Sequence, residues 1–278
     1  MSTKIVYLAH TQQRILDDAV FSILNLVHQG VEKLDCEILV GTDKPECFDG
    51  LPVTIWPVSE EQIEGWKGEI DFIHRTKPCF LALVAEANPE HNILYFDADT
   101  AVKSSLPKML TQIGGGQAIM HASEGTLAEA EMPVYKKLRV GIKSGELNLD
   151  GLPQTEMFNA GVIGIPAKHT GIFREVVASV DVFYPKLKVH IVEQVLFSYL
   201  IGKKASVIDS SNQVVHWWGK GLNTGPVISE FLRSSGELNL EAKSAAAVRL
   251  VQTIEQTPFN RNPTFLERLK RSVKKRIK

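Results

Sequence analysis

An uninterrupted apolar segment, Ile93-Leu94-Tyr95-Phe96, ends directly at two acidic residues, Asp97 and Asp99. A short run without a charged side chain is typical of a strand that is buried on both faces, as in a parallel sheet covered by helices. Upstream, the hydrophobic pattern predicts strands at 5–8, 37–40 and 53–58 and helices at 14–29 and 76–87. This alternation predicts an α/β fold with a mainly parallel sheet flanked by helices.

The second half of the chain continues the pattern less regularly. Strands are predicted at 117–121, 158–165, 206–209 and 214–217, and a helix at 189–200. From about residue 229 onward the sequence is typical of helices. We therefore expect one domain over residues 1–228 and a helical C-terminal extension over residues 229–278, a division that suits a chain of 278 residues.

Charge is distributed unevenly along the chain. The net charge is −1, but residues 261–278 hold eight Lys or Arg and one Glu, a net of +7, which leaves −8 for the rest. A helix there would have an apolar stripe edged by cations, formed by Phe265, Leu269, Val273 and Ile277. This pattern indicates weak binding to an anionic membrane surface, with a frayed, solvated terminus as the alternative. The net charge of −8 on the rest of the chain would repel a polyanion, which argues against nucleic acid as a partner.

The cysteines and the N-terminus indicate a cytoplasmic protein, peripheral on the inner face of a membrane if the tail binds one. The three cysteines show no metal-ligand or paired spacing, so we expect reduced thiols. The first residues do not resemble a signal peptide, and no apolar run is long enough to span a membrane.

Asp97 and Asp99 are candidate metal ligands. Ligands of α/β proteins bind beyond the carboxyl ends of the strands, which is where these residues lie. Two crowded carboxylates raise each other's pKa unless a cation neutralises them, and a hard divalent ion with oxygen ligands does so. The alternative is that one Asp caps the next helix and the other is solvated.

The segment from Leu94 to Thr100 resembles the D-x-D segment of glycogenin and the bacterial lipopolysaccharide galactosyltransferases, which are retaining transferases of the GT-A fold. The resemblance implies a GT-A, Rossmann-like sheet. It also implies that Asp97 and Asp99 hold Mn²⁺, or Mg²⁺, against the two phosphates of a nucleotide-diphosphate sugar.

Four further segments resemble that family in the same order. Arg75-Thr76-Lys77 resembles an R-x-K at a helix start, and residues 158–162 resemble an F-N-A-G-V strand. Glu193-Gln194 resembles a D-Q pair beside the anomeric carbon, and residues 216–220 resemble the start of H-x-x-G-x-x-K-P-W. The resemblance implies His216 as third metal ligand and a catalytic group of Gln194, Glu193 and Asn159. The implied substrate-binding residues are Ala9, His10, Thr11, Arg75, Lys77, Asp97, Ala98, Gly161, Gly219 and Lys220.

Two segments depart from the family pattern. The K-P-W ending is absent after Lys220, and Ala9-His10-Thr11 lacks the Asp/Asn pair usual near the nucleobase. The resemblance implies a retaining hexosyltransferase that uses a nucleotide-diphosphate sugar, with UDP favoured and a sugar, lipid-linked or protein acceptor left open. Two alternatives remain: a non-catalytic nucleotide-sugar binder, and a phosphohydrolase of the haloacid dehalogenase type, which also places D-x-D after an apolar strand.

Overall fold

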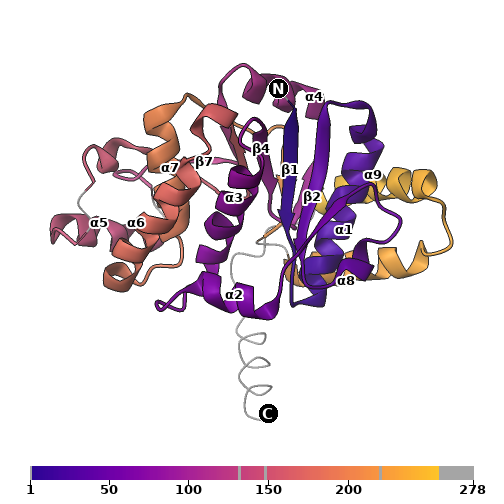
Figure 1. Cartoon of the computed structure of the whole chain (residues 1–278), viewed down its shortest axis with the longest axis horizontal. Helices are drawn as coiled ribbons and strands as arrows, with labels where there is room; N and C mark the ends of the chain where they lie inside the picture. The colour runs from indigo at the N-terminus through magenta and orange to yellow at the C-terminus, as the bar shows by residue number, and fades with distance from the viewer. Residues whose placement is uncertain (1, 131–132, 147–148, 219–220, 257–278) are drawn as a thin grey trace, which may run out of the picture.

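The computed structural model describes residues 2–130, 133–146, 149–218 and 221–256. Its centre is a seven-stranded sheet with helices on both faces (Figure 1). The strands of this sheet are β1 (Thr3–Leu8), β2 (Cys36–Thr42), β3 (Thr54–Pro57), β4 (Asn92–Phe96), β6 (Ala118–Met120), β9 (Val162–Ile165) and β10 (Val207–Asp209). The helices are α1 (Gln13–His28), α2 (Glu60–Lys67), α3 (Thr76–Ala87), α4 (Leu106–Gly114), α5 (Pro133–Lys143), α6 (Ile172–Leu187), α7 (Val192–Lys204), α8 (Gly221–Ser234) and α9 (Leu240–Gln256).

The sheet has the strand order β10-β6-β9-β4-β1-β2-β3. β1 pairs in parallel with β2 and β4, β2 with β3, and β6 with β10, whereas β9 runs antiparallel to its neighbours β4 and β6. The expected mainly parallel sheet is therefore confirmed. Two short antiparallel pairs lie outside it: β5 (Thr100–Val102) with β11 (Val214–His216), and β7 (Ser123–Thr126) with β8 (Glu156–Phe158).

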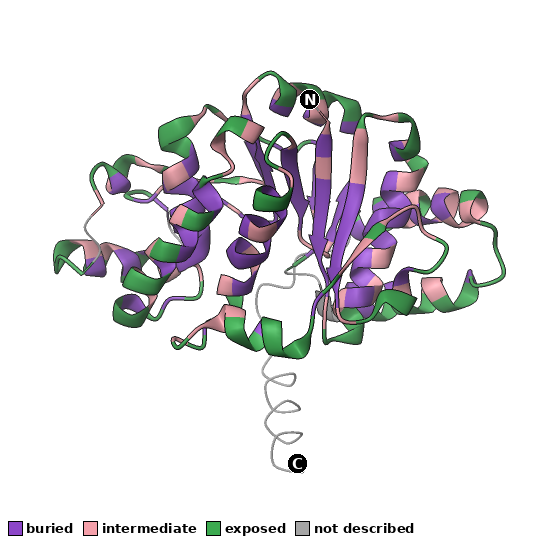
Figure 2. Cartoon of the chain, viewed as in Figure 1, coloured by how far each residue is buried: buried purple, intermediate pink, exposed green. Residues whose placement is uncertain are grey.

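The central strands are buried on both faces (Figure 2). Along β4, Ile93 and Tyr95 belong to the core shared with α3, α6 and α7, while Leu94 and Phe96 belong to the core shared with α1 and α4. All four side chains are at most 3% exposed. The fully apolar run that predicted a doubly covered strand is thus explained by alternate residues packing on opposite faces.

The single strand predicted at 158–165 is wrong. β8 ends at Phe158 and β9 begins at Val162, with a bend over Asn159, Ala160 and Gly161. Oδ1 of Asn159 accepts a hydrogen bond from the backbone N–H of Gly161 at 2.9 Å, a local turn that competes with a continuous strand. Because β9 is antiparallel to β4, this bend lies beside the end of β4, where Phe96 pairs with Val162.

The C-terminal helices pack against α1. A third core unites Phe21 and Leu24 of α1 with Trp217, Ile228 of α8 and Val251 of α9. Helix α8 begins at Gly221, so it runs across the boundary expected after residue 228. The basic segment 261–278 lies outside the described residues. Among the helices that are described, none combines the length and the apolar character required to cross a membrane.

Candidate metal and substrate site

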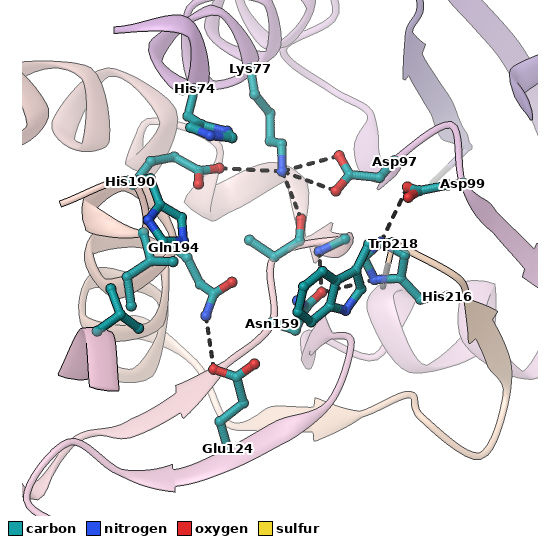
Figure 3. Close-up of a pocket in the computed structure, with 15 residues that line it drawn as sticks. His74, Lys77, Asp97, Asp99, Glu124, Asn159, His190, Gln194, His216 and Trp218 are labelled. Carbon is teal, nitrogen blue, oxygen red and sulfur yellow. Dashed lines mark hydrogen bonds and ion pairs between the residues drawn. The ribbon is translucent and has the colours of Figure 1, made fainter. Parts of the chain in front are cut away.

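Asp97, Asp99 and His216 come together at the carboxyl end of β4, although His216 lies more than a hundred residues further along the chain (Figure 3). One ligand atom from each residue lies within 4.8 Å of the other two. The contact is made by β11, whose His216 pairs with Thr100 in β5, directly after Asp99. The three side chains that sequence reasoning selected as ligands therefore meet at one point.

The backbone of three segments positions this group. The N–H of Asp97 donates to the carbonyl of Gly161 at 2.8 Å, and the N–H of Trp217 donates to the carbonyl of Asp99 at 3.0 Å. Gly161 also leaves room for the imidazole, because a Cβ at this position would lie 2.3 Å from Cε1 of His216. A glycine is therefore required here by the close approach of the histidine ring.

The hydrogen bonds of His216 favour a cation between its ring and Asp99. Nδ1 lies 3.1 Å from Oδ1 of Asn159, the oxygen that already accepts from Gly161, so Nδ1 donates the proton. In the neutral ring Nε2 then carries a lone pair, and it faces Oδ1 of Asp99 at 3.2 Å. Two acceptors this close require a proton or a metal ion between them, and an imidazole oriented through its other nitrogen is a typical metal ligand.

Lys77, in the first turn of α3, neutralises the carboxylates behind the site. Its Nζ lies 3.1 Å from Oδ1 of Asp97 and 3.4 Å from Oε1 of Glu193, and it donates to the carbonyl of Ala160 at 3.0 Å. Tyr95 donates its hydroxyl to Oδ1 of Asp97 at 2.7 Å. Asp97 is thus held in place by two donors from the core.

Burial and charge act in opposite directions on the pKa values of these groups. Burial would lower the pKa of Lys77, but the carboxylates of Asp97 and Glu193 raise it above its usual value. For Glu193 burial dominates and raises the pKa, with Lys77 opposing. Burial would raise the pKa of Asp99 as well, yet when a proton lies between Asp99 and Nε2 of His216, the charge and hydrogen bond of the imidazolium bring the pKa of Asp99 below its usual value. The site therefore stabilises charge at Lys77 and at Asp99.

Gln194 lies across the cavity from these ligands, in the first turn of α7 (Figure 3). Its Nε2 donates to Oε2 of Glu124 at 3.0 Å and to the hydroxyl of Tyr135 at 3.0 Å, and Tyr135 in turn donates to Glu124. Burial raises the pKa of the Glu124 carboxyl above its usual value. Both hydrogens of the Gln194 amide therefore have acceptors, and its carbonyl oxygen is directed toward the cavity (Figure 3).

Two cavities meet at the acidic pair. The first, of about 250 Å³, extends toward α7 and is lined by residues that include Asn159, Gly161, Glu193, Gln194 and Trp218. The second, of about 240 Å³, extends toward the end of β1 and the starts of α1 and α3. Both are lined by His74, Lys77, Asp97 and Asp99. A ligand bound at the acidic pair therefore has room on two sides.

Other predicted site residues fall into three groups. Ala98 and His10 line the second cavity, whereas Ala9 and Thr11 line neither of the two. Gly219 and Lys220 lie outside the described residues. Arg75 lies apart from both cavities, since Nε and Nη2 bind the carboxylate of Asp181 on α6 at 2.6 and 2.9 Å.

Sequence reasoning missed several lining residues. Glu124 and His74 come from irregular or short segments whose place could not be anticipated. Arg14 and Asp18 line the second cavity from α1. Asp18 did leave a signal in the sequence, because it is an acid on the apolar stripe of its predicted helix. The structure confirms that it is buried, at 1% exposed.

No protein-family model matches this sequence, and no curated protein sequence matches it. Several solved structures are similar in fold. A galactosyltransferase, LgtC, in complex with donor and acceptor sugar analogs is 18% identical, with 75% of this chain and 74% of that chain covered and a TM-score of 0.46. Mouse xyloside xylosyltransferase 1 is 10% identical (82% and 93% covered, TM-score 0.47), and core-mannan synthase A from Aspergillus fumigatus, in a Mn/GDP form, is 8% identical (74% and 73% covered, TM-score 0.43). Likenesses at this level concern architecture, so the functional argument depends on the residues of this chain.

Proposed function

We propose that this chain is a glycosyltransferase that transfers a sugar from a nucleotide-diphosphate donor, with a divalent metal ion held by Asp97, Asp99 and His216. The observation that supports this proposal best is the convergence of these three ligand atoms within 4.8 Å, at the junction of two cavities. A diphosphate on such an ion would have space for a nucleoside on one side and for a sugar and an acceptor on the other.

The donor set fits a hard or borderline divalent ion, because it consists of two carboxylates and one imidazole. When bound, Mn²⁺ or Mg²⁺ would neutralise the negative charge that develops on the departing diphosphate. Neighbouring side chains orient the ligands for this ion. Lys77 and Tyr95 hold the carboxylate of Asp97, and Asn159 orients the ring of His216 so that Nε2 faces Asp99.

Within this proposal Gln194 faces the transferred sugar. Its carbonyl oxygen, directed toward the cavity, is a suitable dipole for the positive charge that builds on the sugar ring in an oxocarbenium-like transition state. Glu193, the neighbouring carboxylate, is 3% exposed and paired with Lys77, which makes it a poor nucleophile. We propose a UDP-hexose donor and transfer with retention, both of which rest on the sequence resemblance.

Of the two alternatives, the phosphohydrolase is disfavoured by the residue that follows the acidic pair. That family has Thr or Val at the fifth position of its D-x-D-x-[T/V] segment, whereas this chain has Ala101 there. A non-catalytic nucleotide-sugar binder would share the whole site. Turnover, as opposed to binding, separates that alternative from the transferase.

The proposal is tested by incubating the protein with UDP-galactose, UDP-glucose, UDP-N-acetylglucosamine and GDP-mannose in Mn²⁺, in Mg²⁺ and in EDTA. We expect the protein to release nucleoside diphosphate only when metal is present, and we expect Asp99→Ala to abolish this release. The matched control is Asp49→Ala, which removes an exposed carboxylate far along the chain from the D-x-D segment. Metal-independent release, or equal activity in Asp99→Ala, would contradict the proposal.

We also propose that residues 261–278 attach the protein to anionic membranes from the cytoplasmic side. The support is the cationic, periodically apolar sequence described above. Co-sedimentation with vesicles of increasing anionic lipid content should retain the full chain and release a chain that ends at Pro263. If the two chains sediment equally, the membrane role is wrong while the transferase proposal is unaffected.

A further inference from the structure

Arg14 occupies a distinctive position in the second cavity. It lies in the first turn of α1, and its Nη1 is 3.2 Å from Oδ2 of Asp18, one helical turn further on. The side chain of Asp18 is 2% exposed, whereas that of Arg14 is 49% exposed. Gly225 of α8 lies beside the stem of Arg14, where an added Cβ would lie 3.3 Å from Cδ. The guanidinium of Arg14 is thus held through Nη1 by Asp18, while the side chain lines the cavity.

The other basic side chains of this cavity are less able to bind an anion. They are His10, His74 and Lys77. Lys77 is already paired with Asp97 and Glu193. Burial lowers the pKa of His10, and burial together with the charge of Lys77 lowers that of His74 to about 4, so both imidazoles carry a positive charge less readily than an ordinary histidine.

The surroundings of Arg14 suit a phosphate group. The cavity that it lines also contains Asp97 and Asp99, so a diphosphate bound through a metal ion at these two carboxylates, as proposed above, would lie in the same space. The first turns of α1 and α3 line this cavity, and helix N-termini favour anions. A guanidinium has five N–H donors and matches phosphate oxygens in pairs, and Asp18 engages Nη1.

We propose that Arg14, held in place by Asp18, binds the diphosphate of the nucleotide donor, whereas the sequence resemblance implied Arg75 among the substrate-binding residues. The inference rests on the proposed function, because it concerns the donor of that reaction. It also assigns the two cavities: the nucleotide occupies the one lined by Arg14, and the transferred sugar and acceptor occupy the one lined by Gln194.

Calorimetry with UDP and GDP in the presence of Mn²⁺ tests this inference, and uridine and guanosine serve as probes without phosphate. The principal variant combines Arg14→Met with Asp18→Asn, which leaves the formal net charge unchanged and no unpaired buried carboxylate. We expect the Kd for both diphosphates to rise about tenfold to hundredfold, the range for charge-assisted hydrogen bonds, with nucleoside affinity unchanged. Arg233→Ala is the matched control, because it removes a helical, exposed arginine that pairs with Glu230.

Arg14→Lys is a second variant that keeps the charge next to Asp18. It should lose part of the diphosphate affinity, because an ammonium group cannot bind two phosphate oxygens in a planar fork. Thermal unfolding of each variant verifies folding, and the lysine variant decides the question if the double variant does not fold. If these variants bind the diphosphates with wild-type affinity, the role of Arg14 is wrong and the proposed function is unaffected. Absence of Mn²⁺-dependent diphosphate binding in the wild-type protein overturns the proposed function as well.

Discussion

The amide of Gln194 donates through Nε2 to Oε2 of Glu124 at 3.0 Å, and the two residues are seventy positions apart in the chain. Tyr135 completes the arrangement by accepting from Gln194 and donating to Glu124. An amide whose two hydrogens both donate hydrogen bonds cannot rotate without breaking those bonds. The direction of the Gln194 carbonyl is therefore determined by residues outside its own helix.

Gln194→Ala should lower kcat about tenfold or more while the Kd for UDP with Mn²⁺ stays within about twofold, because the carbonyl acts on the sugar in the transition state. If Glu124 acts only through Gln194, adding Glu124→Ala to Gln194→Ala should cause little further loss of kcat. Independent, additive losses in this double-mutant cycle would show that Glu124 has a separate role.

Gly161→Ala should weaken Mn²⁺ binding without removing a ligand. The new Cβ would lie 2.3 Å from Cε1 and 2.5 Å from Nδ1 of His216, so the imidazole must leave its present position beside Asp99. We expect the Kd for Mn²⁺ to rise about tenfold, by analogy with the loss of groups that orient metal ligands. Calorimetric Mn²⁺ titration measures this, with Gly65→Ala as control, since no heavy atom lies within 4 Å of a Cβ there. Equal Mn²⁺ affinity in both variants would contradict the role given to His216.

Lys77→Met should destabilise the protein and make its stability depend more strongly on metal than that of the wild type. Removing the ammonium leaves Glu193 buried without its partner and Asp97 without its nearest cation, and breaking a buried pair costs about 3–5 kcal/mol. Mn²⁺ should restore part of the loss, because it neutralises Asp97. Urea unfolding with and without Mn²⁺ provides the measurement, and adding Glu193→Gln should recover part of the stability in the absence of metal. A variant as stable as the wild type would show that the pair is not buried in solution.

Asp18 should make the stability of the fold depend on pH. Burial, with a smaller contribution from Asp99, raises the pKa of Asp18 from 3.8 to about 7, and Arg14 opposes this shift. The folded protein therefore holds a proton that the unfolded chain has already released, so this group's contribution to stability is lost as pH rises from about 4 to about 7. Each unit of pKa difference corresponds to about 1.4 kcal/mol.

Asp18→Asn removes that dependence. Urea unfolding between pH 5 and pH 8 should show the variant gaining stability over the wild type as pH increases, whereas Asp49→Asn, at an exposed position, should show no such trend. A constant difference between Asp18→Asn and the wild type across this range would mean that Asp18 keeps an ordinary pKa.

The elements that were predicted well are those with a strong local pattern. The helix expected at 76–87 agrees with α3, and the buried strand before Asp97 agrees with β4. The strand expected at 158–165 failed because the side chain of Asn159 makes a local turn that hydrophobicity does not reveal. The helix expected at 189–200 begins three residues later, at Val192, which places Gln194 in its first turn.

By itself, the sequence determined the buried strands, the helices between them and the candidate ligands Asp97 and Asp99, because apolar periodicity and residue chemistry are local properties. His216 was a candidate ligand through the family resemblance. The tertiary structure decided which of these residues act together. It brought His216 to Asp99 through the pairing of β5 with β11, and it placed Arg75 against Asp181 while leaving Arg14 open to the cavity. Charged side chains that are distant in sequence pair only where the folded chain brings them close together, and strand pairing and helix packing determine where that is.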